Sequence, residues 1–214
     1  MALAGRTLSE MADPAAVDLA RAERLVAQAL AASPASPLGH FAKGEVLRAQ
    51  GRPEEAALEY ETAIASNRNF VYAISALAQC KLLTGSIEEV IPAQERAIRL
   101  SPRDLNIFVF YLQIGLVHLL QSRTDQAIAW LEKARNANPV HPQPHSWLAS
   151  AYALKGDIER AAAELADARR MSVDDRHTSI TRLKAAIYWG VPKIRALFEA
   201  TYFAGLRKAG LPEE

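Results

Sequence analysis

The sequence has one cysteine and no excess charge of either sign. Cys80 is the only cysteine among 214 residues, so an internal disulfide is excluded. A chain without disulfides fits a reducing compartment, and a cytoplasmic location is expected. Lys and Arg number 25 against 24 Asp and Glu, a formal net charge of +1. This balance excludes the strong basic field that draws proteins to nucleic acid or to membrane surfaces.

Long apolar runs and the common active-site motifs are absent as well. The N-terminal residues lack the basic segment and apolar run of a signal peptide, because Glu10 and Asp13 interrupt them. No stretch reaches the roughly 20 apolar residues of a membrane span. Phosphate-binding loops, dinucleotide fingerprints, nucleophile elbows and zinc-protease motifs do not occur. The sequence predicts neither an enzyme nor a membrane protein, and no cofactor or metal.

Small residues recur at a fixed period. Ala22, Ala56 and Val90 stand 34 residues apart. Ala127 and Ala161 repeat this spacing, 37 residues after Val90. A second alanine follows seven residues later in every copy, at Ala29, Ala63, Ala97, Ala134 and Ala168. A spacing of seven places both small residues on one helix face, which predicts closely packed helix pairs.

A second set of signals precedes each of the last four copies in the same phase. The segments are His40-x2-Lys43-Gly44, Ile74-x2-Leu77-Ala78, Tyr111-x2-Ile114-Gly115 and His145-x2-Leu148-Ala149. Turn glycines follow at Gly51, Gly85 and Gly156, and Ser122 takes this place in the remaining unit, where a tight turn is still expected. Together these signals resemble the tetratricopeptide-repeat (TPR) family, whose pattern is W-x2-L-G-x2-Y…A-x3-F…P.

The resemblance implies an all-α fold, a right-handed superhelical solenoid of helix-turn-helix repeats. The expected array covers residues 1–176, with units at about 3–36 (degenerate in its first helix), 37–70, 71–104, 108–141 and 142–175. Residues 105–107 form an insertion. Residues 177–214 are expected to form capping helices over the last unit. One lies near 178–189, with Ile187 and Tyr188 on its apolar face, and another follows Pro192.

The first helix of each unit is expected to line a concave groove that binds a protein or peptide partner. The predicted groove residues are Leu38, Phe41, Glu45, Arg48, Tyr72, Ser75, Gln79, Val109, Leu112, Gln113, Leu116, Gln143, Trp147 and Ser150. The alternative is that some of them pack under the cap. The Lys and Asn residues of a chaperone-type carboxylate clamp are missing. No nucleic acid or membrane partner is expected, and a homodimer through a terminal repeat is compatible with the pattern.

Three patterns that could indicate chemistry have structural explanations. His141 and His145 are four residues apart, but prolines separate them and a third ligand is missing, which favours packing over a metal site. A buried, inert Cys80 is favoured, although Lys81 could lower its pKa. Acidic residues recur at the start of each second helix, including Glu54 and Glu55, where they complement the helix dipole.

Two stretches show a narrower resemblance, IPAQERAIRLSPRD at 91–104 and GLRKAGLPEE at 205–214. Both resemble the C-terminal TPR tail of bacterial class III adenylate/guanylate cyclases, a tail also found behind some winged-helix regulators. This implies a protein-interaction scaffold that acts as the regulatory or oligomerising tail of a signalling cyclase, although the cyclase catalytic domain is absent from the sequence. The alternatives are a stand-alone TPR adaptor or the sensor module of a winged-helix transcription regulator.

Overall fold

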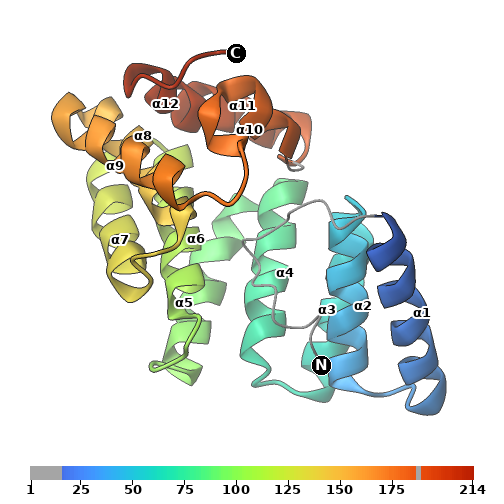
Figure 1. Ribbon diagram of the computed structural model, residues 1–214. Helices are drawn as coiled ribbons and strands as arrows, with labels where there is room; N and C mark the ends of the chain where they lie inside the picture. Colours follow the sequence, from blue (N-terminus) through green and yellow to red (C-terminus); the bar gives the residue numbers. More distant parts are fainter. Residues whose placement is uncertain (1–15, 187–188) are drawn as a thin grey trace. The chain divides into compact units, whose positions relative to one another are not determined.

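The computed structural model describes residues 16–186 and 189–214, and within these ranges every regular element is a helix (Figure 1). The all-α prediction is therefore confirmed. The chain divides into two compact units, Met1–Pro102 and Arg103–Glu214. The first helix expected within 3–36 falls mostly on residues outside the described ranges, as do Ile187 and Tyr188.

Unit 1 is a row of antiparallel helices, each packed on the next. They are α1 (Ala16–Ala32), α2 (Pro37–Ala49), α3 (Pro53–Ser66), α4 (Val71–Thr84) and α5 (Val90–Leu100), the last preceded by a short 3-10 turn, η1 (Ile87–Glu89). Proline opens α2 and α3, where its missing N–H costs no hydrogen bond and its fixed φ suits a helix start.

The small residues of the repeat lie where two helices approach closely. A Cβ built on Gly44 of α2 would come within 2.4 Å of the Tyr60 ring on α3. A Cβ on Gly115 would come within 2.7 Å of Leu131 in the same way. Ala56, Tyr60 and Ala63 have no exposed surface. Close approach of paired helices therefore explains the period.

The turns between paired helices require a left-handed backbone. Gly51, Gly85 and Gly156 have φ values of 72°, 108° and 93°. Ser122 adopts φ 58° at the same place in its unit. The tight turn predicted there is confirmed, and serine holds a conformation that favours glycine.

Unit 2 contains two further helix pairs. They are α6 (Ile107–Leu120) with α7 (Thr124–Ala137), and α8 (Pro142–Lys155) with α9 (Ile158–Met171). Helix α6 is apolar almost all round and is buried on most of its surface. It is therefore part of this unit's core, where it packs mainly on α7.

The C-terminal segment packs on α8. After a 3-10 turn, η2 (Arg176–Thr178), it forms α10 (Ile180–Ala186), α11 (Pro192–Phe198), a π-helical turn η3 (Glu199–Phe203) and α12 (Ala204–Lys208). Both η3 and α12 contact α8. The chain end is tied back to α10, where the N–H groups of Ile180 and Thr181 donate to the carbonyls of Pro212 and Glu213. The predicted C-terminal cap is confirmed.

Candidate functional site

In unit 1, the accessible part of the predicted groove lies on α2 and α4, which are the first helices of their repeats. Leu38, in the first turn of α2, is 63% exposed. Phe41 is half-buried, and its ring lies 5.8 Å from that of Tyr60 and 5.1 Å from that of Phe70. The same helix therefore offers an exposed apolar side chain beside an aromatic one that its neighbours already hold in place.

A polar cluster lies one turn further along α2. Arg48 Nη2 donates to Glu45 Oε2 at 2.7 Å, and Tyr60 Oη donates to Glu45 Oε1 at 2.6 Å. Arg48 is 6% exposed. Burial, together with the nearby Glu45 carboxylate, raises the pKa of Tyr60 well above its ordinary value, so the phenol stays protonated. Glu45 and Arg48 thus neutralise each other and hold α2 against α3.

Helix α4 contributes a mixed surface. Tyr72 and Gln79 are half-buried. Ser75, which the sequence places between them on the groove, is fully buried, and its carbonyl accepts a hydrogen bond from Gln94 Nε2 at 3.2 Å. Ser75 therefore belongs to the packing between α4 and α5. Tyr72 and Gln79 keep some surface for a partner.

The predicted groove residues of α8 are covered by the chain itself. Trp147 stacks on Tyr202 with ring centroids 3.8 Å apart, and Ser150 Oγ donates to the Tyr202 carbonyl at 2.9 Å. Trp147 and Ser150 are 5% and 0% exposed. A third contact joins the hydroxyls of Ser146 and Tyr202 at 2.6 Å. The expectation that Trp147 and Ser150 face a partner is corrected for this conformation, because burial of large aromatic rings holds the C-terminal segment there.

The remaining groove positions of unit 2 offer little surface. Val109, Gln113 and Leu116 of α6 are all buried, and so is Leu112. Gln143, in the first turn of α8, is half-buried. Tyr202, which the sequence places in the capping helix expected after Pro192, fills the α8 face. Sequence patterns did not show which groove residues this tyrosine would cover.

The two histidines near the start of α8 have packing roles. His141 Nδ1 accepts from the Gln143 N–H at 3.3 Å, and its ring lies 5.0 Å from that of Phe108. His145 Nδ1 lies 2.7 Å from Glu164 Oε2. Within the described ranges, no three His, Cys, Asp or Glu side chains come together as a metal-binding group. The contacts of His141 with Gln143 and Phe108, and that of His145 with Glu164, agree with the packing interpretation.

Cys80 is buried in the core between Tyr60 and Ala76. Burial raises the pKa of its thiol to about 12. The buried thiol that the sequence favours is confirmed, and loss of hydration outweighs the nearby positive charge of Arg48. Lys81 instead pairs with Glu61 and Glu89, at 3.7 and 4.0 Å. The thiol is therefore not a nucleophile at neutral pH.

None of the helices described is both long enough and apolar enough to cross a bilayer.

Two family profiles match the chain, both described as tetratricopeptide repeat, over residues 15–70 and 118–187. Together they cover more than half of its length.

Three solved structures illustrate how widely this fold is shared. PilW, described as a widely conserved type IV pilus biogenesis factor, has a TM-score of 0.67 at 16% identity, with 90% of each chain covered. PilF of Pseudomonas aeruginosa has a TM-score of 0.65 at 18% identity, covering 90% of this chain and 85% of that one. A thermophilic TPR protein of Thermus thermophilus has a TM-score of 0.63 at 20% identity, covering 89% and 93%. The repeat phase, the helix pairs and these matches together show that the chain belongs to the tetratricopeptide-repeat family.

Proposed function

We propose that this chain is an adaptor that binds a polypeptide partner on unit 1. The proposed surface consists of Leu38 of α2 with Tyr72 and Gln79 of α4, and is termed the α2–α4 face. The observation that supports it best is the contrast between the two units. Leu38 of α2 is 63% exposed, whereas Trp147 of α8 is covered by Tyr202. The groove face that remains accessible therefore lies on unit 1.

The chemistry of this face favours a peptide with an apolar anchor and little charge. Leu38 and Tyr72 supply apolar surface, and Gln79, which is half-buried, adds a polar side chain. Glu45 and Arg48 are already paired, so they offer no excess charge. A short helix or an extended segment with one large apolar side chain fits these properties.

The matches to known proteins favour an adaptor over the tail of a cyclase. The match to PilW covers 90% of both chains, so the likeness in fold extends over nearly the whole of that protein. The comparisons give no support to a cyclase tail or to a winged-helix sensor module. A protein-binding role, without catalysis, is what the family and the α2 surface support together. Homodimerisation and a cytoplasmic location remain predictions.

A peptide library displayed on phage and selected on the full chain tests this proposal. Synthetic peptides from the selection are then titrated against Leu38→Ala and Leu58→Ala. The two leucines have the same exposed fraction, 63%, but Leu58 lies on α3, a second helix of the repeat. Loss of a buried leucine contact costs about 1–2 kcal/mol, so Leu38→Ala should weaken binding roughly 5- to 30-fold.

Leu58→Ala should leave the affinity unchanged. If Leu38→Ala has no effect, or if both variants lose affinity equally, the α2–α4 face is not the binding surface. Circular dichroism of both variants checks that the fold is retained. Since both leucines are exposed, neither change should cost more than about 0.5 kcal/mol of stability.

A further inference from the structure

Each complete repeat has a pair of positions, 19 residues apart, between its two helices. One position lies on the first helix of the repeat and the other on the second helix. His40 lies 2.7 Å from Glu59 in this way, and His145 lies 2.7 Å from Glu164. In a third repeat the pair is Tyr111 and Trp130, with ring centroids 5.7 Å apart. In each case two large or polar side chains fill the space between the helices.

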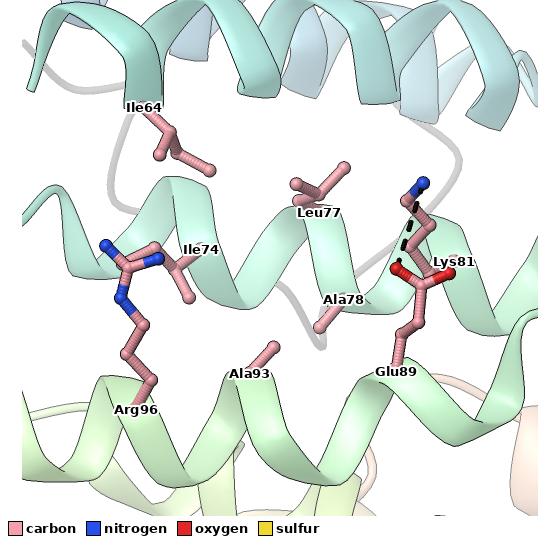
Figure 2. Close-up of a pocket in the computed structure, with 8 residues that line it drawn as sticks. All are labelled: Ile64, Ile74, Leu77, Ala78, Lys81, Glu89, Ala93 and Arg96. Carbon is pink, nitrogen blue, oxygen red and sulfur yellow. Dashed lines mark ion pairs between the residues drawn. The ribbon is translucent and has the colours of Figure 1, made fainter. Parts of the chain in front are cut away.

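The remaining repeat has small and aliphatic residues at these positions. Ile74 and Ala93 stand there, and an open cleft of about 160 Å³ lies between α3, α4 and α5. Its floor and walls are apolar, formed by Ile64, Ile74, Leu77, Ala78 and Ala93 (Figure 2). Ala93 is smaller than the glutamate or tryptophan at the equivalent place in the other repeats, which leaves room for the cleft.

The two ends of the cleft are charged. Lys81 and Glu89 lie 4.0 Å apart at one end and pair with each other (Figure 2). Arg96 lies at the other end, where its Nη2 donates to the carbonyl oxygen of Arg68. Within residues 16–186 and 189–214, no carboxylate lies within ion-pairing distance of Arg96. One end therefore carries a paired cation and anion, and the other has guanidinium N–H groups that can donate hydrogen bonds to a carboxylate.

This cleft lies on the opposite side of α4 from the proposed groove. Ile74, Leu77, Ala78 and Lys81 follow the i, i+3, i+4, i+7 spacing of one helix face. Gln79, a groove residue, lies on another face of the same helix. A partner held at the cleft therefore would not compete with a peptide on the α2–α4 face.

We propose that the cleft is a second docking site, which takes one bulky apolar side chain of a partner polypeptide with a carboxylate beside it at Arg96. The size supports this occupant, because an apolar cavity of about 150 Å³ accommodates benzene. The charge supports it as well, because the Arg96 end has no paired anion among the described residues. A chain with two such surfaces can join two polypeptides, as an adaptor must.

The test is an NMR titration of the full chain with N-acetyl-L-phenylalanine and with its amide. The acid should shift the backbone amides of Ile64, Leu77 and Ala93. Its dissociation constant should be about 3-fold lower than that of the amide, as expected for an exposed ion pair. Arg96→Ala should remove this difference, and Arg99→Ala, three residues along the same helix and exposed, should preserve it.

Filling the cleft gives the decisive variant. Ala93→Leu should reduce binding of both compounds at least 10-fold, and Ala65→Leu at an exposed position should not. If Ala93→Leu unfolds, Ala93→Met supplies a more flexible side chain of similar size. Absence of shifts at the lining residues, or equal binding by the filled variant, overturns the proposal. The Leu38→Ala result does not affect this outcome, so the two surfaces fail or succeed separately.

Discussion

The imidazole of His145 is held between the carboxylate of Glu164 and the carbonyl of Pro139, at 2.7 and 3.1 Å. His40 makes the same pair of contacts, with Glu59 at 2.7 Å and the Pro34 carbonyl at 2.9 Å. Each histidine thus joins its own helix to the second helix of the repeat and to the preceding turn. The histidine–glutamate contact thus recurs in two repeats, and its contribution to stability should increase with the burial of the pair.

Glu164→Ala should destabilise the chain by about 2–3 kcal/mol, because it leaves His145 and Arg135 in a largely buried site without their carboxylate. Glu59→Ala should cost less, since its partner Lys43 is 47% exposed. Urea unfolding followed by circular dichroism measures both. Glu159→Ala, exposed on the same helix as Glu164, is the control. Equal losses for Glu159→Ala and Glu164→Ala would contradict a role for the buried pair.

His177 should make stability depend on pH. Burial lowers the pKa of His177 from 6.5 to about 4. Between pH 6.5 and about 4, His177 binds a proton in the unfolded chain but not in the folded chain. The free energy of unfolding therefore falls as pH drops through this range. The full effect is about 3 kcal/mol. His177→Asn should show a smaller loss between pH 6.5 and 5 in urea unfolding, and identical slopes for both proteins would refute this assignment.

His145 should act in the opposite direction. Burial alone would lower its pKa, but the hydrogen bond with Glu164, joined by that with the Pro139 carbonyl, outweighs burial and raises it. Its protonated form therefore stabilises the fold below pH 6.5, and this contribution is lost as pH rises through the raised pKa. NMR titration of the imidazole carbons should show His145 titrating above 6.5 and His177 well below it. The reverse order would contradict both environments.

Ser122→Gly should stabilise the protein. Serine at φ 58° bears steric strain that glycine relieves, which outweighs the greater entropy of glycine in the unfolded chain. A gain of about 0.5–1 kcal/mol is expected. The reverse change at an equivalent turn, Gly51→Ser, should destabilise by a similar amount, since φ there is 72°. Thermal unfolding measures both, and a loss on Ser122→Gly would show that the serine side chain has a role of its own.

Gly205→Ala should weaken the attachment of the C-terminal segment. Alanine is the better helix former, yet its Cβ would lie 2.2 Å from Ser150 Oγ and 2.5 Å from the Ser150 carbonyl oxygen. The clash should cost roughly 1–3 kcal/mol. Lys208→Ala, exposed on the same helix, should be nearly neutral. Urea unfolding monitored by tryptophan fluorescence reports this through Trp147 and Trp189. A stabilised Gly205→Ala would mean that α12 does not approach α8 this closely.

The periodic features could be read from the sequence, and the aperiodic ones could not. Gly44 and Tyr60 belong to a pattern that recurs every 34 residues, or 37 at the insertion, so a contact of this kind is expected in each copy of the repeat. Tyr202 and Ser146 are 56 residues apart, and no repeat relates them. Whether a groove residue such as Trp147 is free therefore depends on a tertiary contact that local patterns do not encode. The cleft beside Ala93 could be predicted only in part. The small residue at position 93 is visible in the repeat pattern, but the volume of the cleft depends on how α3, α4 and α5 pack.

A peptide should bind the α2–α4 face, because the C-terminal segment fills the equivalent face of α8. Amide hydrogen exchange of the full chain, with and without a peptide selected on it, tests this most directly. Exchange should slow in α2 and α4 and stay unchanged in α8, α11 and α12. Slowed exchange in α8, or faster exchange in α11 and α12 as the segment is displaced, with no change in α2 and α4, would contradict it.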